Sequence, residues 1–410
     1  MTDERYLQVY LHNKPIGTLS LMAGDQTIFA FEEDYINNPQ RDTLSLSFKS
    51  LQGGLITDIR PSRARLPTFF SNLLPEGPLR EYLAKKIGVS EKREFFLIRE
   101  LGLDLPGAVT IEAFNEPLQH APDEKHKSAT QESPDPPLRF SLAGVQLKLS
   151  AIKKATGGLT IPTEGKGGSW IVKLPSMTFK AVPENEFHMM HLADQVGITV
   201  AETELIPVDK ISGLPVDFGG FKGNALAVKR FDRTEEEFSI HMEDFAQIFR
   251  VYPEKKYDKA NYKNIAEVIF AESGLEDALE FVRRLVFNAL IGNGDMHLKN
   301  WSLIYPDRKH ARLSPAYDLL STIPYIKDAK TALNLVSDKE MASLSIDQLS
   351  HFAAKARLPE KPVLQVARET IEKFLMVWRN GEYLQDMDVI RDAINQHIKT
   401  IRLVHEVQRA

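Results

Sequence analysis

The chain begins with segments in which apolar and polar residues alternate. Residues 6–12 (YLQVYLH) alternate, a turn follows at Asn13 to Pro15, and the alternation resumes over residues 16–21 and 27–32. A period of two, broken by turn residues, is typical of β-hairpins with one buried face. We therefore expect antiparallel strands at the start of the chain.

Helical spacing replaces this alternation farther along. Between residues 78 and 88, apolar side chains recur at intervals of three and four, as they do on one face of a helix. A second segment of this kind, residues 93–102, ends at Gly102, a residue typical of a helix C-cap. Strands followed by helices predict a mixed α/β domain at residues 1–114.

The character of the sequence changes at residues 115–138. This stretch holds five prolines, many charges and almost no large apolar side chains, which predicts a linker or loop. Beyond it, short apolar segments predict a small sheet, and we expect one helix at residues 185–197. We assign residues 139–233 to a small β-rich lobe. Its expected strands lie within residues 139–152, 169–175, 203–208 and 225–231.

From residue 234 to residue 410 the apolar residues recur mostly with the helical period, which predicts a helical lobe. A β-rich lobe followed by a helical lobe is the order of elements in protein kinases. The predicted fold class is therefore α+β: a protein-kinase-like two-lobed domain preceded by a mixed α/β domain. The expected helices span residues 241–252, 276–292, 345–356, 362–378 and 386–404.

The composition restricts the possible functions. A chain of 410 residues, 43% hydrophobic and 26% charged, is too long for a single core, and the lack of cysteine excludes disulfides and thiolate chemistry. The net charge of −5 is spread along the chain, so we expect any DNA contact to be local or made through a partner. Without an uncharged apolar run of membrane-spanning length, we expect a cytoplasmic protein that does not cross a membrane.

The run from Gly292 to Asn300 (GNGDMHLKN) contains the most informative residues. Asp295 precedes Asn300 by five positions, and Asp318 follows 23 positions after Asp295 in SPAYDLL. Phosphoryl transfer requires an aspartate that accepts a hydroxyl proton, together with hard oxygen ligands for Mg²⁺. Because this spacing matches the kinase catalytic loop and its metal-binding aspartate, it predicts Asp295 as the base and Asn300 and Asp318 as Mg²⁺ ligands.

Other interpretations of this run remain open. Asp295 and Asn300 alone could form a polar turn after a helix, and Asp318 is the residue that favours catalysis. His297 either orients the loop or contacts phosphate. Lys299 either contacts the transferred phosphate or is a solvated charge.

Upstream, Lys173 lies in the apolar strand IVKLP. A strand lysine needs a partner, and in kinases such a lysine binds ATP phosphates and a helix glutamate. Glu186 is the candidate glutamate, although Glu184 is close and either residue could simply favour the helix N-terminus. The alternative for Lys173 is a side chain that snorkels from a strand edge.

Residues 140–148 (FSLAGVQLK) occupy the position of a kinase phosphate-covering loop, between the linker and the lysine strand. The segment contains no GxGxxG pattern. Gly144, flanked by small residues, could still let backbone N–H groups approach a phosphate. Its place in the order of elements is what favours nucleotide binding.

Nine blocks stand out along the chain: the hairpin ending in IGTLSL, FFSNLLPEGPLR, LPGAVTI, FSLAGVQLK, WIVKLP, NEF, AVKRFDR, IGNGDMHLKN and SPAYDLLS. Together they resemble the HipA family, the kinase component of bacterial toxin–antitoxin pairs, along nearly the whole chain. The resemblance implies a protein-kinase-like domain after an N-terminal mixed domain, with ATP and Mg²⁺ as ligands. It implies Asp295 as proton acceptor, Lys173 on the ATP phosphates, and Asn300 and Asp318 on the metal.

The resemblance also implies a nucleotide site with a hinge at residues 229–231 against the adenine. Position 229 carries lysine where the family pattern leads us to expect an acidic residue. The nucleotide-binding residues that it implies are Ala143, Gly144, Val145, Gln146, Leu147, Lys148, Lys173, Lys229, Arg230, Phe231, His297, Leu298, Lys299, Asn300, Tyr317 and Asp318.

Regulation and partners are implied in the same way. Ser141 matches the family's autophosphorylated serine, and a phosphate there would add nearly two negative charges beside the nucleotide loop and switch the enzyme off. The implied partner is a helix-turn-helix antitoxin of the HipB type, which binds operator DNA and holds the kinase in a repressive complex. Translation components such as aminoacyl-tRNA synthetases are the implied substrate class.

Two other functions fit part of the sequence. A small-molecule phosphotransferase would also use the Gly-Asp, four residues, Asn loop. A degenerate kinase fold could act as a binding scaffold or corepressor, although the joint presence of Lys173, Asp295, Asn300 and Asp318 argues against it.

Overall fold

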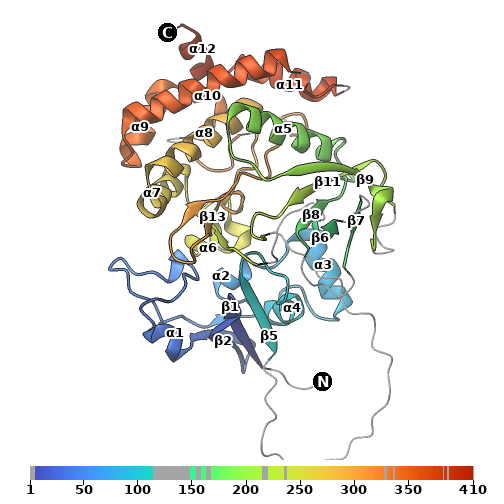
Figure 1. Cartoon of the computed structure of the whole chain (residues 1–410), viewed down its shortest axis with the longest axis vertical. Coiled ribbons are helices and arrows are strands. Elements are labelled where there is room, and N and C mark those ends of the chain that lie inside the picture. Colours follow the sequence, from blue (N-terminus) through green and yellow to red (C-terminus); the bar gives the residue numbers. More distant parts are fainter. Residues whose placement is uncertain are drawn as a thin grey trace, which may run out of the picture.

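The chain is arranged in three tiers in the computed structural model: an N-terminal domain, a β-rich lobe and a helical lobe (Figure 1). In the part of the chain that is described, no helix is both long and apolar enough to cross a bilayer. The structure describes residues 5–113, 148–153, 158–162, 168–214, 220–234, 238–326, 330–335, 338–381, 383–385 and 387–409.

A five-stranded antiparallel sheet forms the base of the N-terminal domain and confirms the predicted hairpins. The strand order is β4-β3-β2-β1-β5, so the last strand returns to pair with the first. Leu7, Val9 and Leu11 of β1 are buried, as the period-two pattern requires. The strands are β1 (Tyr6–Leu11), β2 (Lys14–Met22), β3 (Gln26–Phe31), β4 (Ser62–Arg63) and β5 (Val109–Ala113).

Helices cover one face of this sheet, and Gly102 ends the last of them as predicted. Its φ of −58° is ordinary, so glycine is not needed there for a left-handed turn. A Cβ at this position would instead lie 2.0 Å from the carbonyl oxygen of Ile111, so glycine lets the helix end against β5. The helices are α1 (Glu33–Asn37), α2 (Thr68–Ser71), α3 (Gly77–Lys86) and α4 (Glu94–Leu101).

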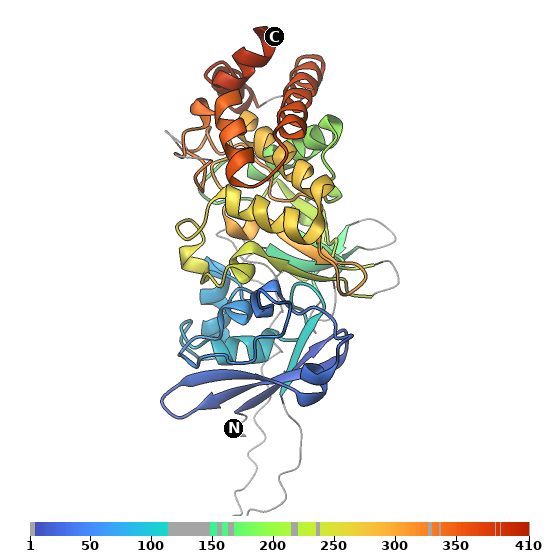
Figure 2. The ribbon, with the colours of Figure 1, turned by 90° about the vertical axis from the view of Figure 1, so that its left-hand side faces the viewer.

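In its described residues, the β-rich lobe is a six-stranded sheet with one α-helix, α5 (Val182–Val196). Alternate residues of its strand β11 face two different cores. Ala225 and Ala227 join the core of the N-terminal domain, whereas Leu226 and Val228 join that of the helical lobe. This sheet therefore lies between the other two tiers, as Figure 2 shows. Its order is β10 (Ile211–Ser212), β7 (Leu159–Thr160), β6 (Lys148–Lys153), β8 (Trp170–Lys173), β11 (Asn224–Lys229) and β9 (Thr203–Pro207).

The helical lobe confirms most of the predicted helices and corrects three details. Residues 386–404 do not form one helix, because the chain breaks after Ile398 and buries Ile401 before the next helix begins. One helix, α7, was not predicted. The helices are α7 (Tyr262–Ser273), α8 (Leu275–Ile291), α9 (Ile346–Lys355), α10 (Glu360–Asn380), α11 (Asp388–Ile398) and α12 (Arg402–Arg409).

The predicted helix at residues 241–252 is wrong except over its middle third. His241–Asp244 is a strand, β12, with four consecutive buried residues, and only Phe245–Ile248 is helical (α6). Strand β12 pairs with β13 (Ser302–Tyr305), which pairs with β14 (Arg312–Leu313). This small sheet brings the segment after the hinge beside the predicted catalytic loop.

Candidate active site

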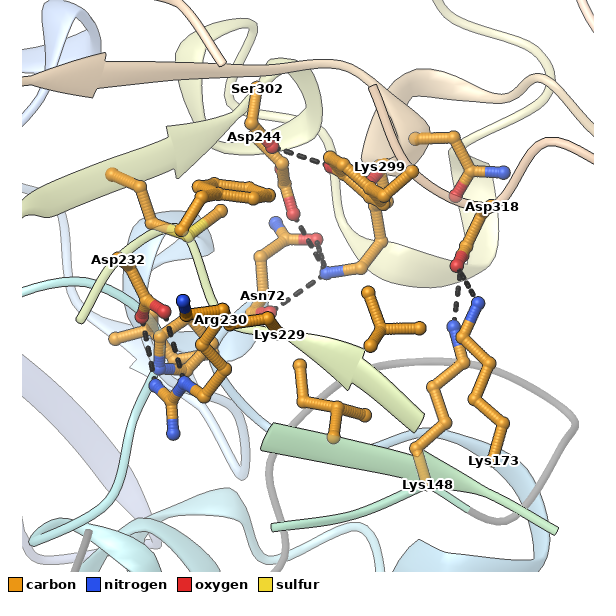
Figure 3. Close-up of a pocket in the computed structure, with 18 of the residues that line it drawn as sticks. Asn72, Lys148, Lys173, Lys229, Arg230, Asp232, Asp244, Lys299, Ser302 and Asp318 are labelled. Atoms are coloured by element: carbon orange, nitrogen blue, oxygen red, sulfur yellow. Dashed lines mark hydrogen bonds and ion pairs between the residues drawn. The ribbon is translucent and has the colours of Figure 1, made fainter. Parts of the chain in front are cut away.

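A cleft with a cavity volume of about 80 Å³ opens where the three tiers meet (Figure 3). Its walls are apolar, and charged side chains stand at both ends. The residues that line it are Asn72, Leu73, Pro106, Lys148, Ile171, Lys173, Val228, Lys229, Arg230, Phe231, Asp232, Met242, Asp244, Gln247, Lys299, Asn300, Ser302, Tyr317 and Asp318.

One end of the cleft holds the phosphate-end cluster, defined as Lys148, Lys173, Glu186 and Asp318. The Lys173 ammonium donates to Glu186 Oε1 and to Asp318 Oδ1. Lys148 Nζ donates to the other oxygen of Asp318 at 2.9 Å. These contacts join β6, β8, α5 and the segment after β14, and Figure 3 shows both lysines pointing at Asp318. The predicted pairing of Lys173 with Glu186 rather than Glu184 is present.

Burial and charge act against each other in this cluster. Burial disfavours the Asp318 carboxylate, yet Lys148 and Lys173 hold the pKa of Asp318 well below its usual range. Burial disfavours the Lys173 ammonium too, but Asp318 and Glu186 raise the pKa of Lys173 to about 12. Burial, aided by the charge of Asp318, raises the pKa of Glu186 despite the contact with Lys173. Asp318 and Lys173 are therefore the charges held most firmly.

The backbone at Asp318 is strained. Its φ is +55°, in the left-handed region that side chains other than glycine rarely adopt. Such conformations persist where the surroundings enforce them, and they concentrate at functional sites. The Asp318 carbonyl accepts from Asn293 at 3.4 Å, and its side chain is held by the two lysines.

The predicted catalytic loop starts at Gly292, where α8 ends. This residue must be glycine, since its φ is +67° and a Cβ would lie 2.6 Å from the side chain of Ile323. Gly294 N donates to Thr322 Oγ1 at 2.8 Å, and Thr322 N donates back to the Gly292 carbonyl at 3.1 Å. The loop is thus tied to the segment that follows Asp318.

Asp295 is half-buried and is held from three sides. Its backbone N donates to Asn293 Oδ1 at 3.0 Å, and its carbonyl accepts from Asn300 Nδ2 at 2.7 Å. Tyr257 donates its hydroxyl proton to Asp295 Oδ1 at 2.5 Å. Burial raises the pKa of Asp295, while the Tyr257 hydroxyl and Lys256 oppose that rise. Asp295 itself is not among the described residues that line the cleft.

Lys299 contacts the N-terminal domain. Its Nζ donates to the Asn72 carbonyl at 2.7 Å and lies 3.0 Å from Asp244 Oδ2, so the ammonium sits between the two, as Figure 3 shows. Asp244 in turn caps α6 in a capping box with Gln247. The sequence left open whether Lys299 contacts phosphate or is a solvated charge. The second interpretation is wrong, because the Lys299 side chain is buried, at 8% exposed.

The other end of the cleft holds the hinge-end cluster, defined as Asp104, Arg230, Asp232 and Arg233. Arg230 forms a bidentate pair with Asp232 at 2.9 and 2.8 Å and donates to Asp104 at 2.8 Å. Arg233 lies 2.8 Å from Asp232. Burial would raise the pKa of Asp232, but Arg230 and Arg233 hold it well below its usual range. This cluster fastens the predicted hinge to the N-terminal domain.

The hinge itself departs from a simple adenine-binding strand. The amides of Lys229 and Arg230 already donate to the carbonyls of Glu202 and Ser169, both at 2.8 Å. Neither N–H is therefore available to donate a hydrogen bond to an adenine ring. The Lys229 ammonium lies 3.2 Å from Glu202 in a half-exposed ion pair. Phe231 reaches the cleft and contacts the ring of Tyr317, with 5.6 Å between ring centroids.

The remaining predicted residues divide into three groups. Leu298 is fully buried in the core of the helical lobe, so its side chain points away from the cleft. His297 is buried, and in the described part of the chain its Nδ1 has no hydrogen-bond partner. Burial lowers the pKa of His297 well below its usual value, which keeps the ring neutral. Ser141, Ala143, Gly144, Val145, Gln146 and Leu147 lie outside the described residues.

Some residues that line the cleft were missed. Asn72, Leu73 and Pro106 come from the N-terminal domain, inside the blocks FFSNLLPEGPLR and LPGAVTI that carried the family resemblance. Those blocks were the signal that could have placed the N-terminal domain at the cleft. Asp244 and Met242 were assigned to a helix, and that assignment concealed their position beside the hinge.

The chain is similar to known proteins over its whole length. Two family models match, the HipA N-terminal domain at residues 7–112 and the HipA-like C-terminal domain at residues 140–378. Y4dM of Sinorhizobium fredii, whose name gives it provisionally as a kinase, is 54% identical and covers 98% of each chain. The serine/threonine-protein kinase toxin HipA of Shewanella oneidensis is 29% identical and covers 86% of this chain and 84% of that protein.

A solved structure confirms the predicted fold. The Shewanella oneidensis toxin–antitoxin complex of HipA, HipB and operator DNA matches with a TM-score of 0.73 at 23% identity, over 98% of this chain and 99% of that chain. This likeness supports the protein-kinase-like two-lobed architecture behind an N-terminal domain. Together with the two family models and the 54% identical relative, it shows that the chain belongs to the HipA family of kinase toxins.

Proposed function

We propose that this chain is an ATP-dependent serine/threonine protein kinase and the toxin of a toxin–antitoxin pair. The observation that carries the proposal is Lys173 in contact with both Glu186 and Asp318 at one end of the cleft. Asp295 and Asn300 lie on a loop that is tied to the same segment. A base, oxygen ligands and a phosphate-binding lysine are the parts that phosphoryl transfer requires.

The donor set fits Mg²⁺ and ATP. Asn300 donates through Nδ2 to the Asp295 carbonyl, which leaves its amide oxygen for a metal, and Asp318 supplies a carboxylate. No group of three His, Asp or Glu side chains suited to a metal occurs in the described residues. Mg²⁺ is usually held by one or two carboxylates together with phosphates. Bound there, Mg²⁺ neutralises charge on the phosphates.

The residues of the chain then have separate roles. Lys148 and Lys173 supply positive charge to the phosphates, and Glu186 keeps Lys173 in place. The acceptor hydroxyl oxygen forms the new bond to the γ-phosphorus, its proton passes to Asp295, and ADP leaves. The apolar walls of the cleft, which include Ile171 and Val228, receive the adenine ring of ATP.

The biological setting is proposed from the relatives. The solved relative is assembled with HipB and operator DNA, and we extend to this chain a helix-turn-helix antitoxin that carries the DNA contact. The net charge of −5 supports contact with DNA through a partner. The family resemblance supports an aminoacyl-tRNA synthetase or another translation protein as substrate, and phosphorylation of Ser141 as self-inactivation.

Phosphoproteomics of cells tests the proposal. Cells that express the chain should stop growing and gain serine or threonine phosphorylation on a protein other than the toxin, and cells that express Asp295→Asn should do neither. Co-expression of a HipB-type antitoxin that binds this chain should restore growth. Phosphate found only on a sugar or amino alcohol would support a small-molecule phosphotransferase instead.

A further inference from the structure

The hydroxyl of Tyr257 lies on the proposed catalytic base. It donates to Asp295 Oδ1 at 2.5 Å, and its ring packs edge-on against His297 with 5.0 Å between centroids. The side chain is 37% exposed. Partial burial, together with the charge of Asp295, raises the pKa of Tyr257 above its usual value. The phenol therefore keeps its proton and acts only as a donor to the carboxylate.

The segment around Tyr257 is fastened to the catalytic loop at both ends. Before it, the Lys256 carbonyl accepts from Leu298 N at 3.4 Å. After it, Tyr262 donates its hydroxyl proton to the Met296 carbonyl at 3.0 Å. Because these bonds hold the backbone on either side, the direction of the Tyr257 side chain is set by the loop that it serves.

The N-terminal domain holds the same segment. Lys256 Nζ pairs with Glu76 Oε2 at 2.7 Å, and the two side chains are only 10% and 18% exposed. The Lys256 ammonium also lies 5.7 Å from the centroid of the Tyr257 ring. The other oxygen of Glu76 lies 3.9 Å from Lys299 Nζ. One glutamate therefore faces a lysine on the catalytic loop and a lysine on the segment that packs against it.

We infer that Tyr257 is a positioning residue for Asp295, and that Glu76 keeps Tyr257 in place through Lys256. The inference rests on the proposed function, in which Asp295 accepts the hydroxyl proton. With Oδ1 occupied by Tyr257 and the backbone of Asp295 fixed by Asn293 and Asn300, the second oxygen faces the acceptor in one orientation. A base must be held within a fraction of an ångström of its acceptor, and such positioning is a large part of catalysis.

This assignment makes the N-terminal domain part of the catalytic apparatus. Glu76 belongs to the turn before α3, about 180 residues away in sequence from the segment that it holds. Loss of the Glu76 contact should therefore alter the chemical step without altering nucleotide binding.

Tyr257→Phe is the first test. The full chain is given Mg-ATP over a range of concentrations, and phosphate incorporation is followed by intact mass. The maximal rate should fall about 10- to 100-fold. The half-saturating ATP concentration should not change, because Tyr257 is not among the described residues lining the cleft. Tyr35→Phe is the matched control, since it removes a tyrosine hydroxyl bonded to the Asp42 carbonyl at 2.6 Å in the N-terminal domain. The control should keep the wild-type rate.

Glu76→Gln is the second test. Its maximal rate should also fall, but by less than that of Tyr257→Phe. The double variant Glu76→Gln, Tyr257→Phe should be no slower than Tyr257→Phe alone, because both substitutions act through the same series of contacts. Lys256→Arg, which keeps the positive charge, should retain more activity than Lys256→Met. Glu272→Gln is the control, because it breaks an ion pair with Lys49 that also joins the N-terminal domain to the helical lobe.

Each other outcome overturns the inference in a distinct way. An unchanged rate in Tyr257→Phe would show that the phenol does not position the base. A faster variant would show that the phenol obstructs the acceptor. A parallel loss of rate and ATP affinity would indicate general damage to the fold. A wild-type chain that binds Mg-ATP yet incorporates no phosphate would overturn the proposed function, and this inference with it.

Discussion

The two ends of the cleft carry buried ion clusters of the same formal charge but of different construction. In the hinge-end cluster, Arg230 and Arg233 also donate to the backbone carbonyls of Leu105 and Gly107, and the Gly107 amide donates to Asp232. In the phosphate-end cluster, each lysine is a single point charge on a flexible stem. Arginine forks with several fixed partners stabilise a structure, whereas lysines can move their charge to a new anion.

The comparison teaches that buried charge alone does not identify a catalytic site. Arg230 is as buried as Lys173, at 3% and 4% exposed. What separates them is the partner set. The hinge-end cluster joins the hinge to the N-terminal domain. Lys173 and Lys148 instead share Asp318, whose φ is +55°, and such conformations concentrate at functional sites.

Lys173→Met should produce the largest effect on activity. The substitution keeps most of the apolar stem and removes the charge, so phosphate transfer should fall by about 10³-fold, or about 4 kcal/mol in the barrier. The loss of folding stability should stay smaller than at the hinge, because Lys148 still pairs with Asp318. Transfer rate and urea unfolding measure the two quantities. Lys153→Met, on an exposed lysine of the neighbouring strand β6, should be silent.

Arg230→Met should produce the largest effect on stability. It leaves Asp104 and Asp232 buried without their main partner, so the free energy of unfolding should drop by about 3–5 kcal/mol. Urea denaturation measures it. The exposed pair of Arg65 with Glu254 provides the control, and its loss should cost about 1 kcal/mol or less. A similar small cost at Arg230 would remove the distinction between the two clusters.

Glu243→Gln tests how the stability of the contact between strand β12 and the N-terminal domain depends on pH. Burial raises the pKa of Glu243 to about 7, although Ser45, Tyr305 and the Leu46 amide donate to its carboxyl group. Between pH 4.5 and 7 the native state keeps a proton that the unfolded state releases, so stability falls as the pH rises through this window. The wild type should lose on the order of 3 kcal/mol relative to Glu243→Gln across it.

The control for this pH dependence is internal. His241, fully buried beside Leu44, has its pKa lowered by burial to about 4, which gives a slope of opposite sign between pH 4 and pH 6.5. His241 contributes this slope of stability with pH to both the wild type and Glu243→Gln, so it cancels when their stabilities are subtracted. Parallel stability curves for wild type and Glu243→Gln would contradict the burial effect on Glu243.

Lys229→Ala should produce the smallest effect. The ammonium pairs only with the half-exposed Glu202, so its loss should change stability by about 1 kcal/mol or less. The ATP affinity should stay within about threefold, less than one tenfold step of 1.4 kcal/mol. Isothermal titration with Mg-ATP checks this. A large loss of affinity would show that the side chain at position 229, and not only the hinge backbone, contacts the nucleotide.

The sequence predicted what local patterns and motif spacing can encode. The hairpins, most of the helices and the pairing of Lys173 with Glu186 were predicted because periodicity and the order of elements specify them. Strand β12 was not, because His241 and Glu243 are buried polar residues whose partners, Leu44, Ser45 and Leu46, lie about 200 residues away. A buried polar residue in a sequence looks like an exposed one until its distant partners are known.

The contribution of the N-terminal domain to the site was missed for the same reason. The contacts of Asn72 with Lys299 and of Glu76 with Lys256 span 227 and 180 residues. No local pattern records such a pairing. Tyr257 follows two lysines in a segment where no helix was predicted, so its contact with Asp295 was visible only in three dimensions.

Phosphate transfer by wild type and by Asp295→Asn, measured at equal Mg-ATP occupancy, tests the central claim most directly. Both proteins should bind Mg-ATP with similar affinity, since Asp295 is not among the described residues lining the cleft. The variant should transfer phosphate at least about 10²-fold more slowly, as expected for loss of a general base. An Asp295→Asn protein that transfers phosphate at the wild-type rate would contradict the assignment of Asp295 and the account built on it.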